Sequence, residues 1–186
     1  INAYLEVGNN IEYDCAILQF RKALEATAYA SISPNKERYR EFRLKGQSSS
    51  DFTKDYNATK IFQYLKQINT DFYPLPLSPP TRMHDETWHF GRKKDNFLTK
   101  EQFPKIYDRL GKFLHADNPW ASDKQRQNIA KDIVVSIPKL RNLLKLHATF
   151  IRSKNYCGVW VVEVSEHEEI KPRIITAVAP GDFKVD

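Results

Sequence analysis

Cysteine, glycine and long apolar runs are scarce in this 186-residue chain, and each shortage excludes a class of protein. Its two cysteines, Cys15 and Cys157, are too few and too far apart for a disulfide framework or a cysteine-rich zinc site. The six glycines are scattered, so the chain has no glycine-rich loop of the kind that cradles phosphates. No apolar run approaches the ~20 residues that a membrane-spanning helix needs. We therefore expect no membrane partner.

The overall composition is that of a folded, moderately basic protein. Apolar residues make up 41% of the chain and aromatic residues 12%, which argues against disorder. The 29 basic and 23 acidic residues give a net charge of +6, which is compatible with a polyanionic partner such as RNA. The first ten residues, INAYLEVGNN, lack the basic flank and apolar core of a secretory signal. We therefore expect a cytoplasmic location.

Four segments show the apolar spacing of amphipathic helices. They cover about residues 13–32, 52–68, 99–114 and 123–152, and the last is the longest. Thr99 with Gln102, and Ser122 with Gln125, form capping boxes at the start of the third and fourth segments. Pro138 is expected to kink the fourth helix, and the charged run 36–42 predicts a further short helix.

The remaining segments predict little regular structure until the C-terminus. Residues 71–98 open with four prolines and are expected to be an irregular excursion. The β-rich runs 159–164 and 173–178 predict a hairpin. The fold class is therefore expected to be mainly α, with a bundle of four main helices over 1–155 and a small C-terminal β-hairpin appendage over 156–186. A lone hairpin is marginally stable, so it should pack on the bundle, on another strand such as 3–7, or on a partner protein or domain.

The segment YDRLGKFLHADNPW carries the residues best suited to chemistry. Arg109 lies six residues before His115, near the predicted end of the third helix, and Asp117 and Asn118 follow in a polar loop. Arginine binds phosphate through a fixed fork of donors, and histidine transfers protons near neutral pH. Metal-free RNA cleavage needs these parts: a base, an acid and cationic donors for the developing charge. Arg109 and His115 are therefore the candidate catalytic pair, with Asp117 and Asn118 as substrate-binding candidates.

Spacing alone does not select this pair. With 11 arginines and 5 histidines, about one arginine five to seven residues before a histidine is expected by chance, and Arg82/His89 and Arg141/His147 also fall within this window. His147 falls on an apolar stripe and is expected to be a hydrogen-bonded core histidine, and Arg82/His89 an exposed pair without a role. Arg109/His115 is distinguished by its position at a helix end. The alternative is that His115 only caps that helix, where its cationic form is favoured.

Two further groups of polar residues invite a functional interpretation. Arg21 and Glu25 share one face of the first helix, either as a surface ion pair or as part of a polar, substrate-binding site shared with the third helix. His84 and His89 are five residues apart beside a proline-rich segment, whereas a helical zinc pair is four apart. We therefore expect no metal and no other cofactor, and a metal-dependent enzyme is the weakest hypothesis.

The helix order and the Arg-x5-His motif closing the third helix resemble the HEPN superfamily over about residues 11–152. The segment RKALEA in the first long helix, which contains Arg21 and Glu25, is similar to first helices of one HEPN branch. The resemblance implies a homodimer that cleaves RNA without a metal at a composite site, within a stress or defence system. Arg109 would stabilise phosphate charge and His115 would act as base or acid. Some HEPN domains are inactive, so the alternative function is a non-catalytic helical dimerisation or interaction module of a larger assembly.

Overall fold

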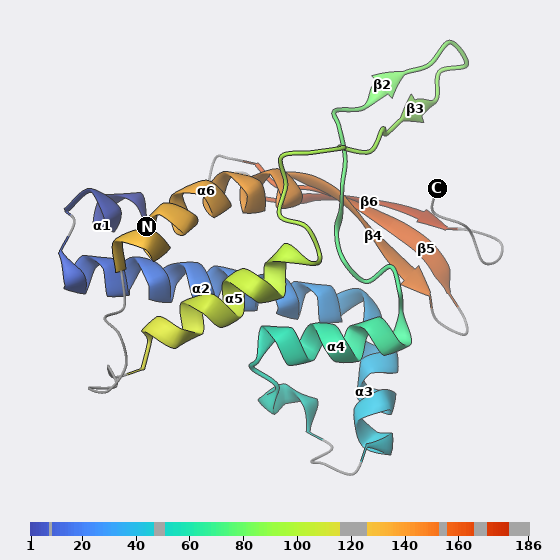
Figure 1. Cartoon of the computed structure of the whole chain (residues 1–186). Helices are drawn as coiled ribbons and strands as arrows, with labels where there is room; N and C mark the ends of the chain where they lie inside the picture. The colour runs from blue at the N-terminus through green and yellow to red at the C-terminus, as the bar shows by residue number, and fades with distance from the viewer. Residues whose placement is uncertain (8, 47–50, 116–125, 153–155, 166–170, 179–186) are drawn as a thin grey trace.

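Helix α2 (Asn10–Ile32) is the central element of the fold, and the other main helices pack around it (Figure 1). The computed structural model describes the whole chain except residues 8, 47–50, 116–125, 153–155, 166–170 and 179–186. Asn9 begins α2, since its side-chain oxygen accepts a 2.9 Å hydrogen bond from the Glu12 N–H. Buried residues then recur every three or four positions along the helix: Ala16, Ile17, Phe20, Leu24, Thr27, Ala28 and Ser31.

Five other α-helices are described. They are α1 (Asn2–Val7), α3 (Lys36–Lys45), α4 (Ala58–Ile68), α5 (Gln102–Phe113) and α6 (Arg126–Leu144), with 3-10 turns at Ser33–Asn35 and Phe52–Lys54. α4, α5 and α6 each pack on α2 and contribute fully buried side chains, such as Leu65, Leu110 and Ile133. Burying one such side chain contributes about 1.5–3 kcal/mol, so this shared core fixes the relative positions of the helices.

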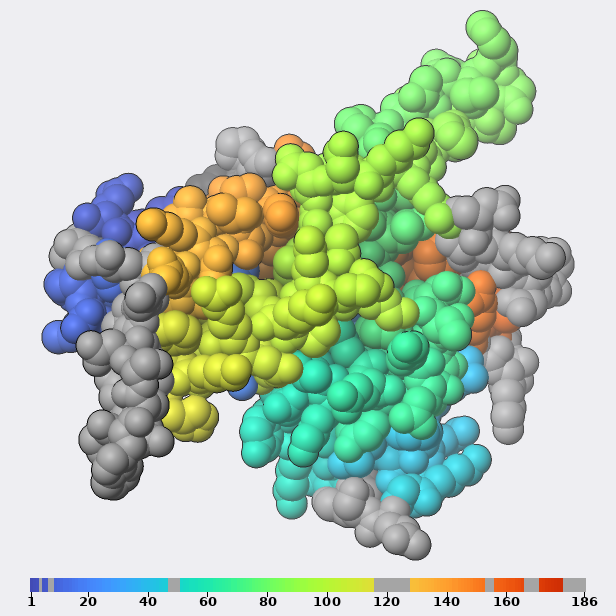
Figure 2. All heavy atoms as spheres, in the orientation of Figure 1, coloured from blue at the N-terminus to red at the C-terminus, as the bar shows by residue number. Residues whose placement is uncertain are grey.

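A four-stranded antiparallel sheet lies beside the helices (Figure 1). Its order is β1 (Leu75–Pro76), β4 (Leu146–Arg152), β5 (Cys157–Glu163) and β6 (Arg173–Val178). Leu77, Ala148 and Phe150 form a small second core against this sheet. A separate two-stranded hairpin, β2 (Thr81–Arg82) and β3 (Trp88–His89), projects from the body of the molecule (Figure 2).

The expected fold class, mainly α with a hairpin appendage, is wrong, because the described chain is mixed α/β. The predicted helix 123–152 ends at Leu144, and Leu146–Arg152 forms β4, which pairs with both β1 and β5. His147 and Ile151 continue the helical spacing and so suggested more helix. However, β4 is buried across five consecutive positions, and a strand buried on both faces loses the alternation that identifies strands.

The structure also describes segment 71–98, which was expected to be irregular, and segment 3–7, which was considered as a strand. Segment 71–98 contains the three two-residue strands β1, β2 and β3: β1 joins the main sheet, and the Leu77 N–H donates to Leu146 O at 2.9 Å. Phe72 and Leu98 are buried in the main core, which anchors both ends of the segment. Segment 3–7, considered as a strand, lies in helix α1.

Candidate functional site

Helix α5 carries Arg109, and the predicted capping box between Thr99 and Gln102 leads into this helix. Gln102 N–H donates to Thr99 Oγ1, and Thr99 N–H donates to Gln102 Oε1, each at 3.2 Å. The helix then buries Phe103, Tyr107 and Leu110 against the core. Arg109 therefore lies on an exposed side of α5, and half of its side-chain surface is accessible.

Arg109 bridges α5 to α6. Its Nη2 lies 2.8 Å from Oδ2 of Asp132, whose side chain is about one-third exposed. The pair crosses an open groove of about 280 Å³ between the two helices, on the face where α5 lies beside α6 (Figure 2). The groove is lined by Gln102, Lys105, Ile106, Arg109, Asp132, Val135 and Ser136. Its mixed lining offers two cations and a carboxylate beside apolar surface.

His115 lies just beyond the end of α5. The helix ends at Phe113, and the Leu114 N–H closes it by donating to Gly111 O at 3.2 Å. The His115 side chain is exposed, so both members of the candidate pair are accessible to solvent. Asp117 and Asn118, the predicted substrate-binding residues of the following loop, lie outside the described residues.

Arg21 and Glu25 form a compact network with Tyr107 of α5. Arg21 Nη2 donates to the Tyr107 hydroxyl at 2.6 Å, and that hydroxyl donates to Glu25 Oε1 at 2.9 Å. Arg21 Nε lies 3.2 Å from Glu25 Oε1, and the guanidinium stacks 3.8 Å from the centre of the Tyr107 ring. Burial, followed by the hydrogen bond to Glu25, raises the pKa of Tyr107 to about 12. The network therefore keeps a neutral phenol between the guanidinium of Arg21 and the carboxyl group of Glu25.

The Arg21 network depends on Gly111, one turn after Tyr107. Arg21 Nη1 donates to Tyr107 O at 3.1 Å, and a Cβ at Gly111 would lie only 2.6 Å from this same nitrogen. Neither Tyr107 nor Gly111 was among the sequence candidates. The available signal was the conjunction of a tyrosine on the buried face with a glycine four residues later in the same helix.

The structure thus divides the predicted site residues into two groups. Arg21 and Glu25 meet α5 at Tyr107, whereas Arg109 meets α6. Positions two apart on a helix point in directions about 160° apart, so the two groups lie on different sides of α5. Arg21 and Glu25 hold α2 against α5 and do not adjoin the Arg109 groove.

The other Arg–His pairs have separate environments. His147 is 8% exposed on β4, and its Nδ1 lies 2.9 Å from Leu144 O. Burial lowers the pKa of His147, so its neutral form is favoured. Arg82 and His89 are exposed on the β2–β3 hairpin, where Arg82 lies 3.3 Å from Glu86.

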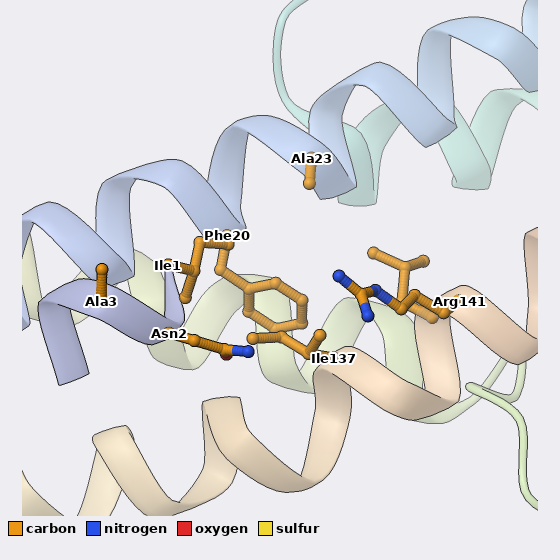
Figure 3. Close-up of a pocket in the computed structure, with 8 residues that line it drawn as sticks. Ile1, Asn2, Ala3, Phe20, Ala23, Ile137 and Arg141 are labelled. Atoms are coloured by element: carbon orange, nitrogen blue, oxygen red, sulfur yellow. The ribbon is translucent and has the colours of Figure 1, made fainter. Parts of the chain in front are cut away.

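A second groove lies between α1, α2 and α6 (Figure 3). It has a volume of about 410 Å³ and is lined by Ile1, Asn2, Ala3, Phe20, Ala23, Ile137, Leu140 and Arg141. The Arg141 guanidinium projects from α6 toward α2 into this largely apolar space. This orientation separates Arg141 from His147, which lies in the following strand.

Searches for a metal site and for a membrane span give no candidate among the described residues. No group of three or more His, Cys, Asp or Glu side chains within these residues is arranged to hold a metal ion. Likewise, none of the described helices is both long and apolar enough to cross a membrane.

The comparisons with known proteins give no relative. No protein-family model matches the chain, and neither a curated protein nor a solved structure is significantly similar to it.

Proposed function

We propose that this chain is a HEPN-like, metal-independent endoribonuclease domain that works as a homodimer in the cytoplasm. The observation that carries the proposal is the placement of Arg109 in the α5–α6 groove, with His115 exposed just beyond the end of the same helix. A phosphate in this groove would meet a cationic fork, and a group able to transfer protons lies at the helix end.

The reaction needs two proton transfers. A base removes the proton of the RNA 2′-hydroxyl, and the 2′-oxygen attacks the adjacent phosphorus. The bond to the 5′-oxygen breaks, and an acid protonates the leaving oxygen, which yields a 2′,3′-cyclic phosphate and a 5′-hydroxyl. Arg109 stabilises the charge that develops on the phosphorane oxygens. One His115 supplies one of the two proton transfers, and His115 of a second copy supplies the other.

The Arg109–Asp132 ion pair is compatible with phosphate binding. Arginine has five N–H donors, and the ion pair with Asp132 engages one of the guanidinium nitrogens, Nη2. An ion pair this exposed contributes only about 0–1 kcal/mol, so a phosphate can compete with the carboxylate.

An exposed apolar side chain at the groove supports a dimer. Val135 of α6 is 57% exposed and lines the groove with Arg109. Contact between two copies at this face would bury Val135 and bring two Arg109/His115 pairs together.

Cleavage of a single-stranded RNA in the presence of a metal chelator tests the proposal. We expect the parent chain to produce cyclic-phosphate ends, and Arg109→Ala to lose most of this activity. Arg82→Ala is the matched control, because Arg82 has nearly the same spacing to a histidine but lies on the exposed hairpin. Equal loss in both variants, or activity that disappears with chelation, would reject the proposed site.

A second variant examines the role of Asp132. Asp132→Asn removes the carboxylate that competes for Arg109, so we expect tighter binding of RNA. Weaker binding would show that the ion pair is needed to hold Arg109 in place.

The second candidate function is a non-catalytic interaction module. The Arg109–Asp132 ion pair favours it, because a neutralised arginine serves helix packing without any substrate. A folded parent chain that neither binds nor cleaves RNA would support this alternative.

A further inference from the structure

Strand β6 is the exposed edge of the main sheet. Over the described ranges it pairs with β5 alone, and all six of its residues, Arg173 to Val178, are exposed. Ile174 and Ile175 are each 58% exposed and Val178 is 68% exposed. Because neighbouring residues of a strand point to opposite faces, β6 exposes apolar side chains on both faces of the sheet.

The hydrogen-bonding direction of β6 follows from the rest of the sheet. The Val164 N–H donates to Lys145 O, one step beyond the pair Leu146–Glu163. Backbone groups alternate in direction along a strand, so even-numbered residues of β5 bond to β4 and odd-numbered residues bond to β6. Leu146 O, which accepts from Leu77 on the β1 side, agrees with this alternation.

Three residues of β6 therefore offer their backbone groups to the outside. The odd-numbered residues of β5 pair with Arg173, Ile175 and Ala177 of β6. These three positions point their N–H and C=O groups inward. The N–H and C=O groups of Ile174, Thr176 and Val178 face outward from the edge.

This edge lacks the features that usually prevent strands from pairing. Native edge strands are commonly protected by an inward charge, a lysine, a proline or a bulge. Residues 174–178, with the sequence IITAV, contain no charged residue and no proline. The charge of the neighbouring Arg173 is paired with Glu163, since Arg173 Nε donates to Glu163 Oε2 at 2.9 Å.

We propose that a second copy of this chain pairs with β6 in antiparallel register about a two-fold axis at Thr176. Ile174 then lies opposite Val178 of the second copy, and Ile175 lies opposite its Ala177. The outward-facing positions 174, 176 and 178 are symmetric about Thr176, so every outward N–H and C=O among them gains a partner. Apolar side chains meet apolar side chains at positions 174, 175, 177 and 178, the two Thr176 side chains meet at the axis, and no like charges are opposed within 174–178.

A second copy fits this edge because the strand 174–178 is uncharged and carries apolar side chains on both faces, so two copies bury each other's apolar side chains. Pro172 and Pro180, which lack an N–H, limit the fully matched register to one centred on Thr176. The product is a continuous eight-stranded sheet. This contact goes beyond the proposed function, since β6 and the His115 end of α5 lie on opposite sides of the molecule (Figure 1). It therefore joins copies independently of the α5–α6 groove.

Replacing Thr176 by proline tests the contact, and the molecular mass in solution is the quantity measured. Thr176→Pro removes one outward N–H and leaves the β5 ladder intact, whereas Thr176→Ala keeps that N–H. We expect light scattering to give Thr176→Pro half the mass of Thr176→Ala and of the parent chain. Equal masses for the two folded variants, or a parent chain that remains a 21.7 kDa monomer, would overturn the proposal.

Cysteine cross-linking tests the register without depending on how the proline variant folds. In a chain with Cys15 and Cys157 replaced by serine, Thr176→Cys places two thiols opposite each other at the axis. Hydrogen-bonded partners have Cα atoms about 5.5 Å apart, within the range of a disulfide. We expect rapid oxidation to a covalent dimer for Thr176→Cys and slow oxidation for Ile175→Cys, which faces Ala177. Equal rates, or no cross-link at Thr176, would contradict the proposed pairing.

Discussion

Tyr107 joins two helices through one side chain. Its ring is stacked by Arg21, and its hydroxyl donates to Glu25 and accepts from Arg21. A buried hydroxyl that loses such partners leaves polar groups unsatisfied at a cost of about 1–3 kcal/mol. Arg21 and Glu25 thus have a sufficient reason for their positions in the packing of α2 on α5.

Replacement of Gly111 by alanine should depend on Arg21. Alanine favours a helix interior by roughly 1 kcal/mol over glycine, but its Cβ would displace the Arg21 guanidinium from Tyr107. We expect Gly111→Ala to stabilise an Arg21→Ala chain and to give no gain in the parent. Urea unfolding of the four chains measures this coupling. Equal effects in both backgrounds would show that Arg21 moves aside without loss.

His147 should make the protein less stable in mild acid. Burial lowers the pKa of His147 from its ordinary value of 6.5 in the folded protein, so the unfolded chain binds a proton first. Its contribution to stability is therefore complete above pH 6.5 and decreases as the pH falls toward the folded-state pKa. We expect His147→Gln to weaken the fall in the urea midpoint over this interval. His84→Gln, on the exposed hairpin, is the control, and an equal change there would contradict the assignment to His147.

At the scale of elements, the predicted reciprocal hydrogen bonds of a capping box between Thr99 and Gln102 are present, in the turn that leads into α5. Thr99→Ala removes the hydroxyl that accepts from Gln102 N–H. We expect the free energy of unfolding to fall by about 1 kcal/mol, measured by urea denaturation. Thr99→Ser retains the hydroxyl and should preserve most of the stability. A similar loss in both variants would indicate that the Thr99 methyl group, rather than the cap, is responsible.

The helices could be predicted where one face is buried and the other is exposed to solvent. α4 and α5 satisfy this condition, and the predicted segments 52–68 and 99–114 contain them. Strand β4 could not be predicted in the same way, because its burial is nearly continuous and His147 and Ile151 also fit a helical period. β5 and β6 lie where the hairpin was expected, but their sheet includes β4 and β1, which required contacts between distant segments.

The candidate site was predictable only in part. The exposure of Arg109 follows from the helical stripe, which buries Phe103 and Leu110 and leaves position 109 outside. The ion pair with Asp132 could not be predicted, because it depends on how α6 packs against α2. The separation of Arg21 and Glu25 from Arg109 depends in the same way on which face of α5 meets α2.

At the scale of the whole molecule, the net charge of +6 should make RNA binding sensitive to salt. Each phosphate neutralised on a single strand releases counterions, so log K falls with log salt with a slope of about −0.7 per contact. We expect a negative slope for the parent chain and a smaller one for Arg109→Ala. Binding that does not change with salt would argue against phosphate contacts in the groove.

The most direct test of the account compares the rates of RNA cleavage by His115→Ala and His89→Ala with the parent rate, in the presence of a metal chelator. General acid–base catalysis contributes about 10²–10⁴-fold to rate. We expect at least a ~100-fold loss for folded His115→Ala and a rate close to the parent for His89→Ala. Undiminished cleavage by His115→Ala, or no cleavage by the folded parent chain, would contradict the catalytic role of His115.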